Sequence, residues 1–353
     1  MTVPGVRFGI IGCGVIGRYH AQAATDSTVV DLLAVSDLRP EVAREVADLH
    51  SVPKVYTDAE SLIADSEIEA VVLAMPAHVR TDLALKAFAA GKHVLTEKPV
   101  AMNSQEVETL IAAKGDLVAG CCCSRYQFLD ATRTLTDFVA SGALGSLRLV
   151  RCRATREAGP PPQQPPPPWR LNRSLNGGGI MSNWGCYDLD YLLGITGWSL
   201  QPQTVLAQTW TVPADFAHYA APDSDAETHV TALIRCQDGI AISYERAEMV
   251  AAETELAWEI IGETGSLRMQ MTPSKDGLMT RFKADTTTGT TSETLCAANE
   301  DHSKVHGGPI NDLAGAIREQ RPAQTSLERA LVIQRITDAI YASATQGNAV
   351  TIP

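Results

Sequence analysis

A predicted strand that runs directly into a glycine-rich turn places the strongest constraint on how this chain folds. The apolar residues 6–11 precede the segment Gly12–Gly17, which has the form Gly-x-Gly-x-x-Gly, and a helical pattern follows it. This order is typical of a dinucleotide-binding βαβ unit. Gly12 permits a tight turn, Gly14 lets a pyrophosphate approach the backbone, and Gly17 lets the helix pack close to the strand. Because N–H groups at a helix start attract phosphates, the predicted cofactor contacts here are Gly12, Gly14, Val15, Ile16 and Gly17.

A carboxylate after the next predicted strand supports the same interpretation. The apolar run 29–35 ends at Ser36 and Asp37, and Asp37 lies 20 residues after Gly17. An acid at this position accepts hydrogen bonds from the adenine-ribose hydroxyls and repels a 2′-phosphate, which favours NAD over NADP. Arg39 is also predicted to contact the cofactor, over the adenine or at a phosphate, and it keeps NADP as an alternative. A glycine turn in another kind of α/β domain is the competing interpretation.

Length, charge and cysteine usage exclude several classes of protein. A chain of 353 residues is longer than one core usually serves, so two domains are expected. The net charge of −12 argues against nucleic acid and anionic membranes as partners. The eight cysteines show no metal-ligand spacing, so we predict no metal site and a reduced, cytoplasmic protein. Residues 8–17 resemble the apolar part of a signal peptide, but cleavage after them would remove the glycine turn.

The pattern of elements changes after residue 122. Residues 6–120 alternate between strands and helices, which predicts an α/β domain with a doubly wound parallel sheet of the Rossmann type over 1–122. Later strand patterns follow one another without intervening helices, which predicts an α+β domain with an open, mostly antiparallel sheet over 123–353. Two further helices are expected near 309–319 and 326–345, and we leave open that they pack back on the first domain.

Two segments have residue types suited to chemistry on a hydroxyl group. Glu97-Lys98-Pro99 follows the predicted strand 93–96, and ligands bind at the carboxyl ends of strands in open α/β sheets. A lysine there can hydrogen-bond a substrate hydroxyl and hold or relay a proton. The alternative is a solvated lysine in a turn.

The second segment begins with Gly177–Gly179 and continues as a predicted helix from Ser182. Asn183, Tyr187 and Asp190 have the spacing i, i+4, i+7, so a regular helix would place them on one face. An amide, a phenol and a carboxylate on one face suit the recognition of a polyol. The alternative is that Tyr187 is a core aromatic with a satisfied hydroxyl.

Several longer motifs resemble the Gfo/Idh/MocA oxidoreductases, the glucose–fructose oxidoreductase and inositol dehydrogenase group. They are FGIIGCGVIGRYHAQAA, AGKHVLTEKP, ASGALGSLR, WRLNRSLNGGG and IGETGSL, and they extend over nearly the whole chain. The resemblance implies a Rossmann domain followed by an open-faced sheet domain that binds substrate and mediates oligomerisation, as a homodimer or homotetramer. It also implies hydride transfer between a nicotinamide and a sugar, polyol or related alcohol.

The resemblance also implies roles for individual residues. Lys98 matches the lysine of the family's Glu-Lys-Pro motif, and Tyr187 stands where most members have histidine and some have tyrosine as the acid/base. Asn183 replaces the usual aspartate, so it can orient a hydroxyl but cannot take a proton, and Ala77 replaces a polar residue. The further predicted cofactor contacts are Pro76, Glu97, Lys98, Trp169 and Arg170. The predicted substrate contacts are Lys98, Arg125, Asn183, Tyr187 and Asp190.

Together these features predict an NAD(H)-dependent dehydrogenase or reductase that acts on a sugar, sugar derivative, glycoside or cyclitol. Two alternatives stay open at this point. One is an enzyme that retains NAD and cycles it within a turnover, as in a sugar–sugar oxidoreductase or a redox-assisted glycosidase. The other is a nicotinamide-sensing regulator without activity, which the replacement at Asn183 keeps open.

Overall fold

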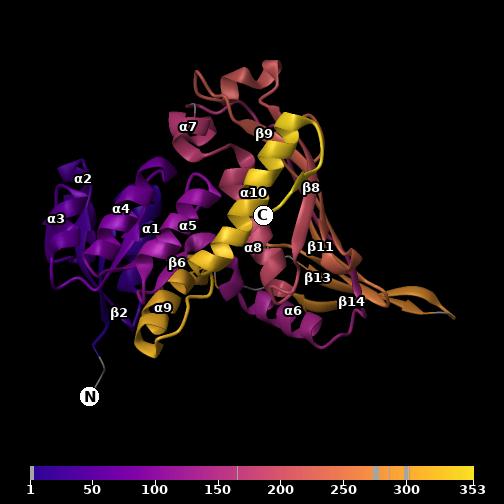
Figure 1. Ribbon diagram of the computed structural model, residues 1–353, viewed down its shortest axis with the longest axis horizontal. Coiled ribbons are helices and arrows are strands. Elements are labelled where there is room, and N and C mark those ends of the chain that lie inside the picture. The colour runs from indigo at the N-terminus through magenta and orange to yellow at the C-terminus, as the bar shows by residue number, and fades with distance from the viewer. Residues whose placement is uncertain (1–3, 165, 273–277, 286, 298–300, 302) are drawn as a thin grey trace. The chain divides into compact units, whose positions relative to one another are not determined.

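The computed structural model describes residues 4–164, 166–272, 278–285, 287–297, 301 and 303–353. Contacts between residues divide the chain into two compact units, which Figure 1 shows in ribbon form. The first unit comprises Met1–Phe128 and His302–Gln334, and the second comprises Leu129–Asp301 and Arg335–Pro353. This division differs from the boundary expected at residue 122, because the segment up to Phe128 and one late segment of the chain pack with the first unit.

Six parallel strands form the sheet of the first unit, in the order β3-β2-β1-β4-β5-β6. They are β1 (Val6–Ile11), β2 (Val30–Ser36), β3 (Lys54–Tyr56), β4 (Ala70–Leu73), β5 (His93–Thr96) and β6 (Ala119–Cys121). The strand order reverses between β1 and β4, which is the topological switch point where ligands bind in such sheets. The predicted doubly wound parallel sheet is confirmed.

Helices connect these strands. They are α1 (Val15–Thr25), α2 (Pro40–His50), α3 (Ala59–Ala64), α4 (Ala77–Ala89), α5 (Ser104–Lys114) and the 3-10 helix η1 (Cys122–Phe128). From the C-terminal part of the chain, α9 (Lys304–Glu319) packs against α1 and η1. The approach of α9 is close, because a Cβ at Gly308 would lie 2.3 Å from the ring of Phe128. A helix expected near 309–319 therefore belongs to the first unit.

The second unit is built on a nine-stranded sheet in the order β14-β13-β12-β11-β7-β10-β9-β8-β15. Its strands are β7 (Leu147–Glu157), β8 (Pro202–Thr211), β9 (Glu227–Cys236), β10 (Ala241–Val250), β11 (Glu255–Gly262), β12 (Gly265–Met269), β13 (Leu278–Asp285), β14 (Gly289–Ala297) and β15 (Val350–Thr351). Among the described strand pairs of this nine-stranded sheet, only β7 and β10 are parallel. The predicted mostly antiparallel sheet is therefore confirmed.

The remaining helices are α6 (Asp130–Ala140), the 3-10 helix η2 (Pro168–Leu171), α7 (Arg173–Asn176), the π-helical turn η3 (Met181–Gly185) and α8 (Cys186–Ile195). Short 3-10 turns occur at η4 (Ala214–Tyr219) and η5 (Gln237–Gly239). The long helix α10 (Leu327–Gln346) begins in the first unit and ends in the second. None of the helices in the described part of the chain is both long and apolar enough to cross a membrane.

The two faces of the nine-stranded sheet differ in burial. Val150, Ile242 and Ile260 are fully buried on the face that α8 covers. On the opposite face Leu206 and Leu233, which are paired across β8 and β9, are 52% and 50% exposed, and Trp210 is 47% exposed. Large apolar side chains are thus left uncovered along one edge of the open face.

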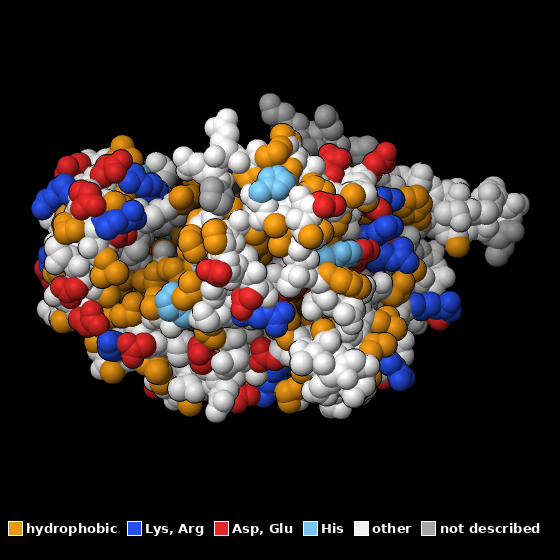
Figure 2. All heavy atoms as spheres, turned by 90° about the horizontal axis from the view of Figure 1, so that it is seen from above, with side chains coloured by type: hydrophobic (Ala, Val, Ile, Leu, Met, Phe, Trp, Pro, Cys, Tyr) orange, Lys and Arg blue, Asp and Glu red, His pale blue; other side chains and the backbone are white. Residues whose placement is uncertain are grey.

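The surface charge agrees with the composition. Lys and Arg side chains are dispersed among Asp and Glu on the face that Figure 2 presents, without a continuous basic area. Together with the net charge of −12, this distribution disfavours binding to a polyanion. The seven cysteines whose side chains the structure describes are buried and form no disulfide bond.

Candidate active site

The glycine turn between β1 and α1 has three glycines with different surroundings. Gly12 has a φ of +94°, and a Cβ there would lie 2.7 Å from the carbonyl oxygen of Ala74. A Cβ at Gly17 would lie 1.9 Å from the carbonyl oxygen of Gly12. At Gly14 a Cβ would meet nothing within 4 Å. Gly12 and Gly17 are therefore needed for packing of the turn, whereas the backbone at Gly14 faces open space that a phosphate group fits.

The start of α1 adjoins this space. Gly14 is the N-cap of the helix, and Val15 is 79% exposed while Ile16 is half-buried. The first turn of α1 has no acidic residue, so its N–H groups and the positive end of the helix dipole are not neutralised there. This arrangement fits an anionic pyrophosphate.

Asp37, at the end of β2, is tied to the glycine turn. Its Oδ2 accepts a hydrogen bond from the Cys13 backbone N–H at 2.8 Å, and its Oδ1 accepts one from the Arg39 backbone N–H at 2.9 Å. The exposed Arg39 guanidinium lies 3.5 Å from the same carboxylate. The structure thus brings Asp37 and Arg39 together beside Gly12–Gly17, in the place predicted for the adenine ribose.

Pro76 and Lys98 follow neighbouring strands. Pro76 is the N-cap of α4, just after β4, and Glu97-Lys98 directly follows β5. Because β1, β4 and β5 are adjacent and parallel, their carboxyl ends lie at one edge of the sheet. Within the first unit, the glycine turn, Pro76 and the half-buried Lys98 therefore come to the same edge, as the sequence predicts.

Glu97 and Arg125, predicted to contact cofactor and substrate, form a buried ion pair with each other. Arg125 Nη2 donates to Glu97 Oε1 at 2.5 Å, and the two side chains are 7% and 5% exposed. The His20 Nε2 lies 2.9 Å from the same oxygen, and the Lys98 backbone N–H donates to Oε2 at 3.0 Å. Burial alone would raise the pKa of Glu97, but Arg125, His20 and Lys98 hold it well below its usual value.

His20 was not foreseen as part of the site, because a single histidine on an α1 pattern gives no local signal of a partner 77 residues away. With Glu97 and Cys122 it brings three potential metal-ligand atoms within 4.8 Å of one another in the described part of the chain. Arg125 already neutralises Glu97, and burial raises the pKa of the Cys122 thiol well above its usual value. The group thus forms a buried ion-pair network around Glu97, and the absence of a metal site stays a prediction.

In the second unit, Asn183 and Tyr187 lie on consecutive turns of different kinds. The prediction of a regular helix from Ser182 is wrong over Met181–Gly185, which forms a π-helical turn, and α8 begins at Cys186. A π turn has i→i+5 hydrogen bonds and changes the angular spacing of side chains. The shared face argued from i, i+4, i+7 therefore does not follow for Asn183.

Burial separates the three residues further. Asn183 is half-buried, Tyr187 is 4% exposed, and Asp190 is fully buried within α8. The Tyr187 ring packs edge-on against Trp184 with 5.6 Å between ring centroids, and the Arg246 guanidinium lies 4.6 Å from the Trp184 ring. Substrate contacts at these positions stay predictions.

Asp188, which sequence analysis did not single out, anchors the helix that contains Tyr187. It accepts hydrogen bonds from Tyr244 Oη and Trp258 Nε1, each at 3.0 Å, and from Arg246 Nη1 at 3.2 Å. Asp188 is completely buried, and burial raises the pKa of its carboxyl despite the nearby Arg246. The network ties α8 to β10 and β11 on the covered face of the sheet.

The triple glycine before this helix has a packing explanation. A Cβ at Gly178 would lie 1.9 Å from Tyr341 Oη, and one at Gly179 would lie 1.9 Å from the Glu227 carbonyl oxygen. The buried Glu227 carboxylate accepts from the backbone N–H groups of Gly179 and Met181 and from Tyr341 Oη. The glycines admit the Tyr341 hydroxyl and the Glu227 backbone to the start of the π turn.

Trp169 and Arg170, predicted to contact the cofactor, lie in η2 of the second unit. Trp169 is 37% exposed, and Arg170 Nη2 donates to Glu248 Oε2 on β10. Their contact with cofactor stays a prediction.

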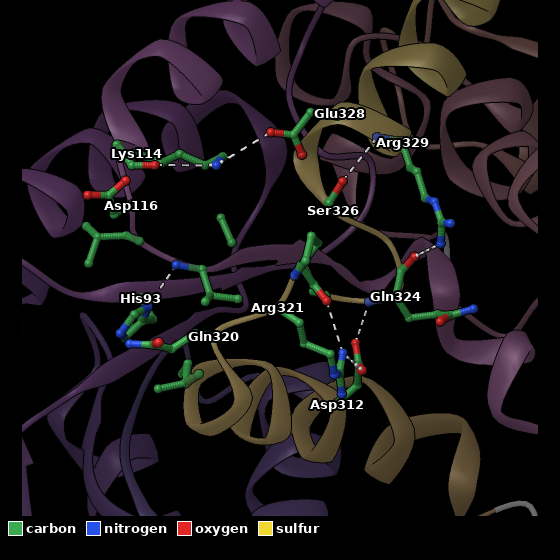
Figure 3. Close-up of a pocket in the computed structure, with 17 residues that line it drawn as sticks. His93, Lys114, Asp116, Asp312, Gln320, Arg321, Gln324, Ser326, Glu328 and Arg329 are labelled. Carbon is green, nitrogen blue, oxygen red and sulfur yellow. Dashed lines mark hydrogen bonds and ion pairs between the residues drawn. The ribbon is translucent and has the colours of Figure 1, made fainter.

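A cavity of about 1340 Å³ in the first unit lies away from the sheet edge that holds the glycine turn. Figure 3 shows its lining, with His93 at the amino end of β5 and the start of α10 on the far side. Two ion pairs lie in its lining, with Lys114 3.5 Å from Glu328 and Arg321 2.8 Å from Asp312. Because it adjoins the amino end of β5, opposite the edge with the glycine turn, we do not assign it to the reaction.

The glycine turn at the switch point, with Asp37 and Lys98 at the same sheet edge, defines an NAD-binding oxidoreductase. Residues 6–117 match the family model described as oxidoreductase family, NAD-binding Rossmann fold, and residues 132–268 match the GFO/IDH/MocA C-terminal domain. The chain belongs to the GFO/IDH/MocA family.

Named relatives include dehydrogenases and a reductase. The chain is 30% identical to myo-inositol 2-dehydrogenase of Thermotoga maritima over 44% of its own length, which spans only 47% of that enzyme. It is 26% identical to 1,5-anhydro-D-fructose reductase of Ensifer adhaerens over 79% of this chain and 80% of that enzyme. A solved levoglucosan dehydrogenase with NADH and L-sorbose superposes with a TM-score of 0.83 at 21% identity and 99% coverage of both chains, which shows the shared fold.

Proposed function

We propose that this chain transfers hydride between a bound nicotinamide and a hydroxyl or keto carbon of a sugar, sugar derivative, glycoside or cyclitol. The observation that supports this most is the position of Lys98, directly after β5 at the edge that also holds the glycine turn. The relatives named for inositol, anhydrofructose and levoglucosan support the same substrate class.

In this proposal three residues act on the substrate hydroxyl, each in a different role. In the oxidative direction, Tyr187 starts as the phenolate, and its Oη takes the hydroxyl proton and becomes the neutral phenol while the hydrogen on the same carbon leaves as hydride, so that a carbonyl forms. Lys98 Nζ donates a hydrogen bond to the reacting oxygen, and its charge stabilises the alkoxide character of the transition state. The Asn183 amide orients the substrate but exchanges no proton. The nicotinamide, when bound, supplies the hydride acceptor.

Cofactor choice follows from Asp37. Its carboxylate is held towards the glycine turn by the Cys13 N–H, and its side chain is only 12% exposed. A 2′-phosphate brought next to this charge would be repelled at close range, so the proposed cofactor is NAD.

We also propose that the protein is a homodimer or homotetramer that uses the open face of the nine-stranded sheet. The exposed Leu206, Leu233 and Trp210 need cover, because apolar areas of this kind are uncommon on monomers. On the same face Arg151 pairs with Glu259 across strands, and such paired charges suit a self-complementary contact. A cytoplasmic location is proposed because the seven described cysteines form no disulfide bond, as is usual in a reducing compartment.

A substrate panel tests the proposed function. The purified protein is incubated with inositols, aldoses, anhydrosugars and glycosides, each with NAD and with NADP, and the absorbance of the reduced nicotinamide is followed. We expect net reduction of NAD with at least one member and its loss in Lys98→Met. If NAD binds but no member of the panel yields NADH, while a glycoside is cleaved or two sugars exchange oxidation state, the cofactor is retained within the turnover instead.

A further inference from the structure

We propose that Glu97, fixed by His20 and Arg125, is a positioning residue that orients Lys98 and sets the charge of its ammonium group. The inference rests on the proposed function only in that Lys98 is taken to touch the substrate. It concerns residues that come from three separate elements of the first unit, namely α1, η1 and the segment after β5.

The two oxygens of the Glu97 carboxylate have different partners. Oε1 receives the Arg125 guanidinium at 2.5 Å and faces His20 Nε2 at 2.9 Å. Oε2 accepts the Lys98 backbone N–H at 3.0 Å. A carboxylate held from both sides cannot rotate freely, and its second oxygen therefore fixes the backbone from which the Lys98 side chain departs.

The anchors are themselves rigid. The His20 and Arg125 side chains are 0% and 7% exposed. Arg125 Nε also donates to the Cys122 carbonyl oxygen at 3.3 Å, which ties the guanidinium to its own helix η1. Displacing Glu97 would thus require disruption of packed groups on α1 and η1, which is how a positioning contact transmits precision to a neighbouring residue.

The charges around Glu97 determine the electrostatic effect. Burial raises the pKa of Cys122 well above its usual value and lowers the pKa of His306, on α9, to about 4, so both are neutral at pH 7. Arg80, on α4, is 1% exposed, its Nη1 donates to Thr96 Oγ1 at 3.3 Å, and it interacts electrostatically with Glu97. Among the described residues, the charged or titratable groups that act on Glu97 thus include Arg125, Lys98, His20, Arg80, Cys122 and His306.

Glu97 therefore balances positive charge from more than one arginine next to Lys98. The attraction is mutual, because the Lys98 charge is one of the causes that lower the pKa of Glu97. Removing the carboxylate would leave the Arg125 and Arg80 cations to repel the Lys98 ammonium. Removing the Arg125 charge would instead favour the protonated form of Lys98, because less of the negative charge of Glu97 would be neutralised.

The test measures the protonation of Lys98 without any substrate. The full-length protein is pulse-labelled with acetic anhydride across a range of pH, and the labelling of Lys98 is quantified by mass spectrometry. We expect the labelling midpoint of Lys98 to fall by about one pH unit in Glu97→Gln and to rise in Arg125→Met. Arg125→Lys retains the charge and should return the midpoint close to that of the wild type.

Two controls accompany these variants. Glu69→Gln removes a carboxylate of the same unit that pairs with Arg7, and it should leave the Lys98 midpoint unchanged. Lys86, an exposed lysine paired with Glu60 and Asp82, serves as the internal control within each sample and should not shift in Glu97→Gln or Arg125→Met. Binding of NAD is measured in parallel to show that each variant is folded.

A purely structural role of Glu97 would lower stability without opposite shifts in the two variants. Equal midpoints in all variants, or shifts in the same direction for Glu97→Gln and Arg125→Met, would overturn the proposal. If Glu97→Gln does not fold, Arg125→Met and Arg125→Lys carry the test, and an Arg125→Met variant without a rise in the Lys98 midpoint would overturn the proposal. Full turnover by Lys98→Met would refute the proposed function of Lys98, while the labelling shifts would still test the network.

Discussion

The buried network around Asp188 gives the prediction with the best-defined magnitude. Replacing Asp188 by Asn keeps the shape of the side chain but removes its charge. The Arg246 guanidinium, which is 4% exposed and lies 3.2 Å from Asp188, would then be a buried cation without its carboxylate. Tyr244 and Trp258 both donate hydrogen bonds to the Asp188 carboxylate. The N–H₂ group of an asparagine would therefore face other donors and could not accept from them.

The expected loss follows from breaking one partner of a buried ion pair. Such a break destabilises a protein by about 3–5 kcal/mol, against a typical total stability of about 5–15 kcal/mol. Burial raises the pKa of the Asp188 carboxyl even beside Arg246, so burying the pair is itself unfavourable. The double variant Asp188→Leu with Arg246→Met should therefore recover most of the loss, because no buried charge remains.

The assay is equilibrium unfolding in urea of the wild type, Asp188→Asn, Asp188→Leu, Arg246→Met and the double variant, of which the last three form a double-mutant cycle with the wild type. Glu263→Gln is the matched control, since it breaks the pair between Glu263 and Arg148, whose side chains are 47% and 68% exposed. That partly exposed pair is expected to contribute at most about 1 kcal/mol. Additive losses in the cycle, or an Asp188→Asn variant within 1 kcal/mol of the wild type, would refute the reasoning.

Three further predictions concern turnover, cofactor choice and acid stability. Lys98→Met and Tyr187→Phe should each lower kcat by about 10²–10⁴-fold with NAD still bound, and the double variant should lose little more, because the two residues act as a unit. Single-turnover kinetics measure these losses. A Tyr187→Phe variant with a kcat within a fewfold of the wild type would show that the phenol only packs. Asp37→Ser should raise the ratio of kcat/KM for NADP to that for NAD at least ~10-fold, and equal use of both cofactors by the wild type would contradict the role of Asp37. Burial lowers the pKa of His306 from 6.5 to about 4. Between these two pH values His306 is protonated in the unfolded state but neutral in the folded state, so the free energy of unfolding should fall as pH drops from about 6.5 towards 4. His306→Gln should flatten this pH dependence in urea titrations, and an unchanged slope would exclude His306 as its source.

Much of the first unit could be predicted from the sequence, because its signals are local. Strand β1 was expected from its apolar run, and the tight turn was expected from the Gly-x-Gly-x-x-Gly spacing. The positive φ at Gly12 and the close approach at Gly17 agree with that expectation. The position of Lys98 at the carboxyl edge follows once β4 and β5 are known to be parallel neighbours. These features depend on residues close together in the chain.

The network around Glu97 could not be predicted in this way. Glu97 was expected at the cofactor, but its carboxylate is buried against His20 and Arg125, which lie 77 and 28 residues away in the sequence. The π turn before α8 was also missed. Gly185 has Met181 Sδ within 2.5 Å of its would-be Cβ, a contact that no periodicity announces.

The sequence by itself determined the class of the fold, the glycine turn for a dinucleotide and the choice of Lys98 and Tyr187 as candidate groups. Tertiary structure alone decided that α9 returns to the first unit, that Asp188 ties α8 to the sheet, and that Glu97 faces inward. The physical reason is that periodicity and backbone preference act over a few residues. A buried charge is stable only where distant segments supply its partners, and that condition is met by packing of the whole unit.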